Sequence, residues 1–427
     1  MIIDSIQQLQ DIKQRTLFVY PIQKDERPHN VANPIIGLVM IDTLTKQSYI
    51  LSISHPEGIY QTNDLSFLKD NTIYCYNVET FIYNKYDTTN FINVKLQYYL
   101  KYNKSYEVDP LPILQQYTRQ YQNCIKINEL IPLYKHEEVA RQIFNECWIK
   151  ELQHGLTFYQ TELFNVFHNI EKQGLKIDTQ PFTERFGQTF SKVEDKCYTQ
   201  YNYYTATGRP SNRFGGINFA ALNKEDNTRE CIISEHGILV EMDFNSYHPR
   251  LIASIVGYDF GNDNVYEHLA KHYHKTDNPT KEQIIEAKEG TFRQLYGGIQ
   301  QQYLHIPFFE NTNNLAKLFW EQFTTQGYVQ SPLSGRRLIS TNYQDINCYT
   351  LFNYFIQMYE TESNVLILKD LFKMLDDDIA PVLYTYDSIL FDLPKEKYNK
   401  LQSILHKVVP KEFPFKLKSG TNYKDLQ

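Results

Sequence analysis

The chain has 427 residues, of which 42% are hydrophobic and 22% are charged, and its formal net charge is −7. This composition fits a globular protein of two or three domains, and it excludes a histone-like nucleic-acid binder that is basic throughout. It still permits an enzyme that grips nucleic acid in one local basic cleft. No apolar run approaches the ~20 residues that a membrane-spanning helix needs, so no membrane segment is predicted.

The start of the chain has no basic stretch followed by an apolar core, so we expect neither a secretory signal nor a transit peptide. The six cysteines are scattered and form no CxxC pair. This pattern predicts reduced thiols, no zinc site and no disulfides, and it indicates a cytoplasmic protein.

The first third of the chain predicts an α/β domain. Segments rich in β-branched and aromatic residues predict strands at 16–22, 34–42, 47–54 and 71–77. A helix is predicted over 90–103, and a second helical stretch over 136–155 is interpreted as a connector. We therefore place a domain boundary within residues 130–155.

The remaining two thirds predict a second domain of mixed elements. Apolar residues at i, i+3, i+4 and i+7 predict an amphipathic helix over 157–174, ended by Gly174. A capping box of Thr280 and Gln283 predicts a helix over 281–297. Hairpins are predicted over 327–340, with the turn at Ser334-Gly335, and over 381–394.

Two aspartates follow apolar strands in this second domain. Asp243 ends the predicted strand ILVEMD, and Asp387 lies at the tip of the last hairpin. Carboxylates from two separate strand ends can hold paired Mg²⁺ ions for in-line phosphoryl transfer. Because Asp is a common turn residue, two structural turn aspartates are the commoner explanation of these residues alone.

The helix predicted over 281–297 carries a cation and two aromatic residues on one face. Lys288, Phe292 and Tyr296 are spaced i, i+4 and i+8. This face suits a nucleoside triphosphate, since Lys pairs with phosphate and aromatic rings stack on the base. The alternative, favoured by the helix alone, is a packed aromatic stripe covered by the stem of the lysine.

Eight segments, in consistent order over roughly 155–427, resemble family A DNA polymerases, the family of bacterial DNA polymerase I and its phage relatives. Motif A resembles DFNSYHPRLIASIVG, motif B resembles KEGTFRQLYGG, and motif C resembles YTYDSILFD. The other five segments are TELFNVFHNIEKQGLKID, TATGRPSNRFGGINFAAL, YVQSPLSGRRL, LFNYFIQMYETE and PFKLKSGTNYKDL. One such segment is weak, whereas eight in order argue against chance similarity.

The resemblance implies a mixed α+β and α/β fold. A polymerase right hand with palm, fingers and reduced thumb would follow an RNase H-like α/β domain of the exonuclease type. The expected domains are a degenerate 3′–5′ exonuclease-like domain over 1–135, a helical connector over 136–155 and a polymerase domain over 156–427. Within the last we expect a thumb remnant at 156–206, palm at 207–262 and 328–427, and fingers at 263–327.

The resemblance also implies a template-directed DNA polymerase that adds dNTPs to a primer 3′ end by two-metal phosphoryl transfer. The expected cofactors are two Mg²⁺ ions, with Mn²⁺ as the alternative. The expected partners are primer–template DNA and dNTPs, with a processivity or replisome protein as a candidate and no membrane. A phage-type enzyme of DNA replication would act in the host cytoplasm.

Site residues follow from the resemblance position by position. Asp243 and Asp387 would hold the catalytic metals. The dNTP would be bound by Lys288, Phe292, Tyr296, His248 and Tyr266, the last at the position of a phosphate-contacting His of the family. The primer–template would be contacted by Arg209, Asn218, Arg336, Arg337, Asn353 and Gln357, and Arg250 would brace the palm.

Several positions depart from the family pattern. His248 replaces the motif A Glu that fences off the sugar 2′ position, and its bulk can still exclude a ribonucleotide. Tyr386 replaces the motif C His, and Ser388 replaces the acidic residue after the catalytic Asp, which leaves two carboxylates rather than three. Ile284 replaces the motif B Arg. The thumb is reduced to Thr179–Ala206.

The N-terminal domain lacks the carboxylates that a two-metal exonuclease needs. The first strand would carry an Asp-x-Glu, but its sequence is LFVYPIQ, and YNVET offers Glu79 where an Asn…Asp pair is expected. Asp25, Glu26 and Glu79 are the candidates for a rearranged site. Because metal sites tolerate few ligand losses, we expect no active exonuclease.

Two alternatives stay open. A single-subunit RNA polymerase or primase-like enzyme shares this palm, and Ser388 resembles its HDS motif, but such enzymes have a small residue at the sugar gate and His248 is not small. A catalytically dead DNA-binding scaffold is the other alternative. The joint retention of Asp243, Asp387 and Lys288 argues against it.

Overall fold

The computed structural model describes residues 1–25, 30–106, 127–187, 189, 192–212, 217–223, 226–261 and 263–426. The chain divides into two compact units. Unit 1 comprises Met1–Leu156 and Gln188–Glu194, and unit 2 comprises Thr157–Gly187 and Asp195–Gln427. Among the described helices none is both long and apolar enough to cross a membrane.

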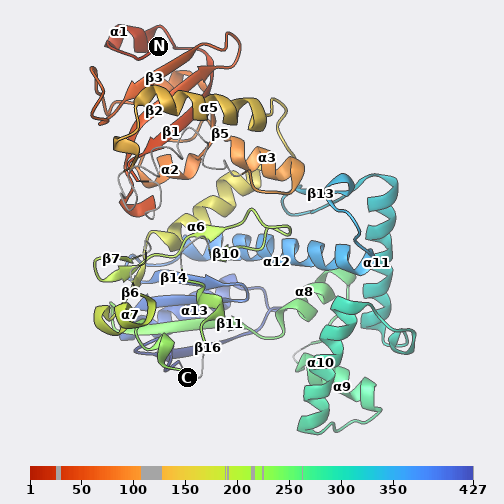
Figure 1. Cartoon of the computed structure of the whole chain (residues 1–427). Helices are drawn as coiled ribbons and strands as arrows, with labels where there is room; N and C mark the ends of the chain where they lie inside the picture. Colours follow the sequence, from red (N-terminus) through yellow and green to blue (C-terminus); the bar gives the residue numbers. More distant parts are fainter. Residues whose placement is uncertain are drawn as a thin grey trace. The chain divides into compact units, whose positions relative to one another are not determined.

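Unit 1 is built on a five-stranded sheet in the order β3-β2-β1-β4-β5 (Figure 1). The first three strands are antiparallel, whereas β4 and β5 run parallel to β1. This order and these directions are those of the RNase H-like fold, as expected from the sequence. The strands are β1 (Thr16–Gln23), β2 (Ile35–Asp42), β3 (Ser48–Ser52), β4 (Thr72–Cys75) and β5 (Phe91–Asn93).

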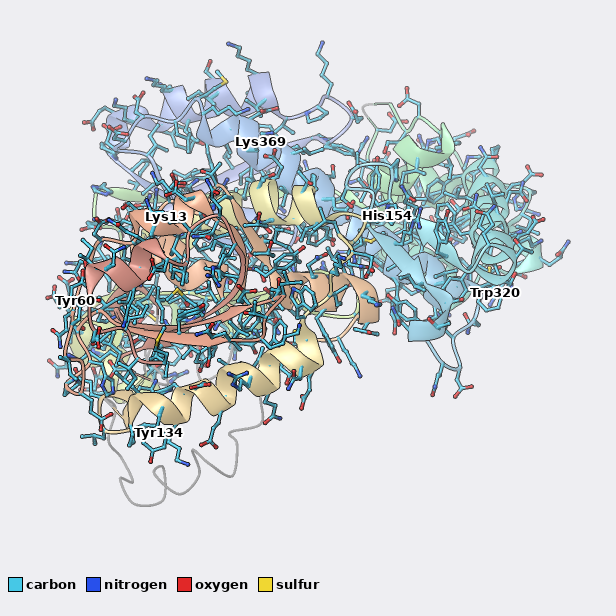
Figure 2. All side chains as sticks on the ribbon, turned by 90° about the horizontal axis from the view of Figure 1, so that it is seen from above. Lys13, Tyr60, Tyr134, His154, Trp320 and Lys369 are labelled. Carbon is cyan, nitrogen blue, oxygen red and sulfur yellow. The ribbon has the colours of Figure 1, made fainter. Side chains whose placement is uncertain are left out.

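The helices of unit 1 pack on this sheet. Among the residues of this unit that the structure describes, they are α1 (Ile6–Gln10), α2 (Val78–Tyr83), α3 (Val94–Tyr102) and α5 (Leu133–Cys147). On α5, Val139, Ala140 and Ile143 are buried in a core shared with β1, β2 and β3. Tyr134, on the outer side of α5, is 53% exposed (Figure 2). The expected connector over 136–155 is therefore corrected, because the apolar face of its helix is part of the core of unit 1.

Unit 2 contains a four-stranded antiparallel sheet in the order β14-β15-β11-β16. Its strands are β11 (Ile238–Phe244), β14 (Ala380–Thr385), β15 (Ser388–Leu393) and β16 (Phe415–Gly420). The predicted hairpin over 381–394 is confirmed as β14–β15. A second predicted hairpin is confirmed as β12 (Tyr328–Gln330) and β13 (Arg337–Ile339).

The helices of unit 2 carry most of the predicted nucleotide- and DNA-binding residues. They are η4 (Phe158–Leu163), α6 (Phe164–Glu171), α7 (Thr179–Phe186), α8 (Tyr247–Val256), α9 (Val265–His274), α10 (Lys281–Gly297), α11 (Pro307–Thr325), α12 (Cys348–Phe372) and α13 (Tyr398–Val408). The capping box of α10 is confirmed, with Thr280 and Gln283 bonded reciprocally. In Figure 1, α9, α10 and α11 lie together beside the sheet, and α8 and α12 link them to it.

The segment expected as a thumb remnant is short. Its helices are η4, a π-helix, followed by α6 and α7. Its remaining elements are the two-residue strands β6 (Leu175–Lys176), β7 (Lys192–Val193), β8 (Lys196–Cys197) and β9 (Tyr201–Asn202), and β10 (Ser211–Asn212) follows. α6 ends at Glu171, and Gly174, the predicted helix end, follows three residues later with φ +69°; a side chain there would meet the ring of Tyr198 at 2.8 Å.

Candidate active site

Strand pairing brings the two predicted aspartates together. Asp243 is the last residue but one of β11 and lies opposite Ser388 at the start of β15. The backbone N–H of Phe244 donates to the carbonyl of Asp387 at 3.0 Å, which ties the hairpin tip to β11. Asp243 and Asp387 consequently line the same cavity at one end of the sheet.

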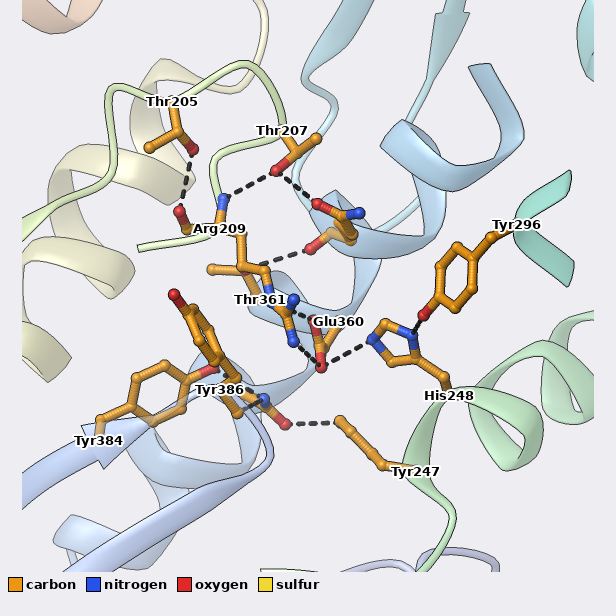
Figure 3. A network of polar contacts seen from close by, with 12 residues as sticks. Thr205, Thr207, Arg209, Tyr247, His248, Tyr296, Glu360, Thr361, Tyr384 and Tyr386 are labelled. Atoms are coloured by element: carbon orange, nitrogen blue, oxygen red, sulfur yellow. Dashed lines mark hydrogen bonds and ion pairs between the residues drawn. The ribbon is translucent and has the colours of Figure 1, made fainter. Parts of the chain in front are cut away.

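The tip of the β14–β15 hairpin is held in an uncommon backbone conformation. Tyr386 has φ 63°, a left-handed value that costs a non-glycine residue about 1–3 kcal/mol. Buried Asn364 of α12 donates to the Tyr386 carbonyl and to the Tyr384 hydroxyl, both at 2.9 Å. Tyr247 in turn donates to Asn364 at 2.6 Å (Figure 3). These contacts hold the turn, and so fix Asp387.

The electrostatics of the pair favour a bound cation. Burial raises the pKa of Asp387 above its usual value, and the nearby charge of Asp243 raises it further. The ammonium of Lys416 lies 3.1 Å from Asp243 and partly offsets the negative charge. Asp243, which is partly buried, and Asp387, at the exposed tip of the hairpin, repel each other and form an oxygen-donor set suited to a hard divalent ion. The residues present therefore fit Mg²⁺.

The cavity has a volume of about 890 Å³, the size of a small-molecule site. Its other walls are formed by α8, α9 and α10. The rings of Phe292 and Tyr296 are stacked, with centroids 5.8 Å apart and planes at 7°. The ring of Tyr266 is 6.2 Å from that of Phe292, and the Lys288 ammonium is 5.7 Å from the Tyr266 ring.

All five residues predicted at the dNTP line this cavity, namely Lys288, Phe292, Tyr296, His248 and Tyr266. The alternative of an aromatic stripe buried in the core does not describe α10, since Tyr296 is 38% exposed. Desolvation of the hydroxyl group raises the pKa of Tyr296 well above the usual value, although the side chain as a whole is partly exposed, so the hydroxyl keeps its proton at neutral pH. The structure thus provides a cation, three aromatic rings and two carboxylates around one space.

Three of the predicted primer–template residues lie close to the same cavity. Arg209 lines it, and its guanidinium lies 3.9 Å from the centre of the Tyr386 ring. On α12, Asn353 donates to the carbonyl of Tyr296 at 3.1 Å, and Gln357 accepts from the hydroxyl of Thr207 at 3.2 Å. The segment containing Arg209 and the helix α12 are therefore joined beside the cavity. Asn218 is exposed at the start of a short 3-10 turn.

The two adjacent arginines of the β12–β13 hairpin have different environments. Arg336 is 1% exposed, and its guanidinium donates to the hydroxyl of Tyr159 at 3.0 Å. It belongs to a buried network around Glu362, which also accepts from Tyr159 at 3.1 Å and from Ser331. The expected contact of Arg336 with primer–template is therefore corrected, because a buried guanidinium in this network supports the fold.

Arg337 keeps the environment of a surface contact. Its guanidinium lies over the ring of Tyr328 at 4.0 Å, and its Nε donates to Gln330 at 2.9 Å. The Gln330 contact is exposed to solvent, so the rest of this side chain can reach a phosphate.

Sequence reasoning missed Glu360 and Asn364. Both are buried, with 1% and 2% exposure; Glu360 lines the cavity, and Asn364 holds the turn at Tyr386. Spacing offered a signal, because Gln357, Glu360 and Asn364 follow at i, i+3 and i+7 and place polar groups on one face of a largely apolar helix.

The exonuclease candidates of unit 1 have ordinary structural contacts. The backbone of Asp25 is bonded to the side chain of Asn33, and Glu79 accepts from Asn93 at 3.4 Å. Glu26 lies outside the described residues. Within the part of the chain that the structure describes, no group of three or more His, Cys, Asp or Glu side chains is placed to hold a metal ion.

Comparisons with known proteins support the fold. No protein-family model and no curated protein matches the chain. Among solved structures, the chain is similar to the POL domain of Pol1 from M. smegmatis, in a complex with DNA primer-template and dNTP. The TM-score is 0.65 at 11% sequence identity, and the match covers 96% of each chain. The expected polymerase fold is thereby confirmed.

Proposed function

We propose that this chain is a template-directed DNA polymerase of the family A type, which adds dNTPs to a primer 3′ end. One observation carries the proposal: Asp243 and Asp387 line the same cavity as the Lys288, Phe292 and Tyr296 face of α10. Separate parts of the sequence supply these residues, and together they match what a nucleoside triphosphate and two divalent ions require.

The proposed roles follow from the positions of the side chains. Two Mg²⁺ ions, or Mn²⁺ in their place, would be held by Asp243 and Asp387 and would stabilise charge on the reacting phosphate. Lys288 neutralises the triphosphate, and Phe292 packs against the sugar and base. His248 forms the wall beside the sugar, where its bulk excludes a 2′-hydroxyl.

The proposed DNA contacts are Arg209, Asn218, Arg337, Asn353 and Gln357. Phosphate contacts supply most of the affinity that does not depend on sequence. A phage-type replication enzyme with so short a thumb would rely on a processivity or replisome protein, which we propose as a further partner.

Primer extension tests the proposal directly. Purified protein would be incubated with a labelled primer–template and Mg²⁺, with either dNTPs or rNTPs. Template-dependent extension with dNTPs supports the proposal. Preferential use of rNTPs, or synthesis without a primer, favours the RNA polymerase or primase-like alternative. DNA binding without any extension favours the scaffold.

Sugar selection is the first quantitative prediction. His248→Ala should raise the kcat/KM for rNTPs relative to dNTPs by roughly tenfold or more, because the side chain beside the sugar is shortened. Phe292→Tyr should raise use of dideoxynucleotides, since the added phenol can stand in for a missing 3′-hydroxyl. Single-nucleotide incorporation kinetics measure both ratios.

Ile285→Tyr provides a control for the second change, because Ile285 lies on the same helix and is 59% exposed. It should leave both ratios unchanged. Unaltered selection in both His248→Ala and Phe292→Tyr would contradict the assignment of this face to the nucleotide.

We also predict low processivity and no proofreading for the chain alone. Two of the three basic residues in Thr179–Ala206 already have acidic partners, since Arg185 pairs with Asp226 and Lys196 with Glu235. Few charges therefore remain for duplex phosphates, and release after a few additions is expected. Extension in the presence of a DNA trap, beside digestion of a mismatched 3′ end, measures both properties.

Products hundreds of nucleotides long under the trap would contradict the thumb argument. Metal-dependent removal of the mismatch that is lost in Glu79→Gln would show that unit 1 is an active nuclease. Asp64→Asn, on the surface of the same unit, is the matched control for that substitution.

A further inference from the structure

Three helices of unit 2 meet through a chain of polar side chains beside the cavity. Glu360 of α12 lies with Oε1 at 2.9 Å from Nε2 of His248 on α8. The other ring nitrogen of His248, Nδ1, is hydrogen bonded to the hydroxyl of Tyr296 on α10. Figure 3 shows His248 between Glu360 and Tyr296. One carboxylate thereby links the residue proposed beside the sugar to the residue at the stacking end of α10.

Glu360 is buried and engaged on both of its oxygens. Oε2 lies 3.0 Å from Nε of Arg209, and Oε1 faces both His248 and a terminal nitrogen of Arg209. A carboxylate at 1% exposure needs such partners, because an unpaired buried charge is strongly destabilising. With its oxygens occupied in this way, Glu360 is placed to hold its neighbours rather than to bind a metal ion.

The contact with Glu360 determines which nitrogen of His248 carries the proton. Nε2 and Oε1 form an ion-pair contact but no regular hydrogen bond, so the interaction is mainly electrostatic. A ring nitrogen with a bare lone pair would be repelled by a carboxylate oxygen at 2.9 Å, so Nε2 carries a hydrogen. In the neutral ring Nδ1 then accepts, and the Tyr296 hydroxyl donates to it.

We infer that Glu360 is a positioning residue for nucleotide selection, which acts through His248 by fixing the tautomer and orientation of the imidazole against Tyr296. This inference rests on the proposed polymerase function. It adds a residue to which the family resemblance gives no role, although it lies within the segment LFNYFIQMYETE, and it explains how a histidine can serve as a rigid wall. An imidazole without this support could turn about its side-chain bonds and exchange tautomers, and the hydroxyl of Tyr296 would lose its acceptor.

Glu360 also provides an acidic group in a region where two acidic residues of the family pattern are absent. His248 and Ser388 stand where the family pattern has acidic side chains, and the structure supplies Glu360 from a third element. Its charge also acts on Asp387, because Glu360 contributes to the raised pKa of that carboxyl after burial and Asp243. One buried side chain on α12 thus places a carboxylate beside His248, the residue that replaces the acidic side chain of motif A.

The first experiment reads the imidazole directly and needs no activity. Full-length protein labelled with ¹⁵N-histidine would be studied by long-range ¹H–¹⁵N NMR, with the His248 signals assigned by their loss in His248→Gln. Wild type should show the tautomer protonated on Nε2, and Glu360→Ala should show a mixture of tautomers. Glu360→Gln, which keeps a carbonyl oxygen with partial negative charge opposite Nε2, should retain the wild-type pattern.

Glu241→Ala is the matched control. Glu241 lines the same cavity and is paired with Lys418, so its removal deletes a carboxylate without touching His248. The His248 signals should not change in this variant. An unchanged tautomer in Glu360→Ala would overturn the inference, whatever the activity of the protein.

The second experiment is a double-mutant cycle on sugar selection. Glu360→Ala should lower the ratio of kcat/KM for dNTP over rNTP by roughly tenfold in the wild-type background, and by less than about twofold in the His248→Ala background. Equal losses in both backgrounds would show that Glu360 does not act through His248, and would overturn the inference. If the wild-type protein extends no primer, the proposed function fails. The NMR spectra still test whether Glu360 fixes the tautomer of His248.

Discussion

Asp243→Asn and Asp387→Asn should each abolish nucleotide addition without unfolding the protein. A carboxylate that holds a catalytic metal contributes several kcal/mol to the transition state, and a loss of about 4 kcal/mol corresponds to about 10³-fold in rate. Primer extension at saturating dNTP measures the effect. Activity within tenfold of wild type in either variant would exclude that residue as a metal ligand.

Asp263→Asn is the matched control, because Asp263 lines the same cavity with a side chain that is 65% exposed. Stability gives a second readout. A carboxyl whose pKa is raised by folding binds its proton more tightly in the folded state, so folding stability falls as pH rises through that pKa. Asp387→Asn removes this cost at pH 7 and should raise the melting temperature, while Mg²⁺ should stabilise wild type more than the variant.

Arg336→Met should destabilise unit 2, whereas Arg337→Met should weaken DNA binding and leave stability unchanged. Removal of Arg336 leaves Glu362 buried without its cation, which costs about 3–5 kcal/mol. Arg337 is a surface residue, so its loss should lower DNA affinity and reduce the salt dependence by about one phosphate contact. Thermal melts and DNA titrations at several salt concentrations measure the two effects separately.

The pH dependence distinguishes the buried network from a general loss of packing. Burial raises the pKa of Glu362, and loss of Arg336 should raise that pKa further. A protonated Glu362 carries no unpaired charge, so the destabilisation in Arg336→Met should shrink between pH 8 and pH 5. Wild-type stability with impaired DNA binding in Arg336→Met would reverse the structural assignment of this residue.

Local pattern was sufficient for the elements that carry the chemistry. Strand endings placed Asp243 and Asp387, and the i, i+4, i+8 spacing placed Lys288, Phe292 and Tyr296 on one face. These features depend on the repeat of side-chain directions within a single helix or strand, and this repeat can be recognised in the sequence. That these residues form one site was predicted only from the resemblance of eight segments, in order, to family A DNA polymerases.

Pairing between distant elements was harder to predict. Arg336 and Arg337 are adjacent in an extended segment, where successive side chains point to opposite sides, and the sequence does not state which side is buried. The role of Glu360 depends on the approach of α8 and α10 to α12. The helix over 136–155 had a visible apolar face, but only the structure shows that this face covers β1, β2 and β3.

The turn at Tyr386 also limits how this sequence can diverge. Glycine would relieve the left-handed backbone, but it would remove the ring on which Arg209 rests. A β-branched residue would worsen the backbone and supply no ring. Histidine, the residue of the resembled family, tolerates this conformation better than most and retains an aromatic face. Substitution of Tyr386 is therefore confined to a few residues with a ring. We expect that a change at this position is accompanied by a change at Arg209.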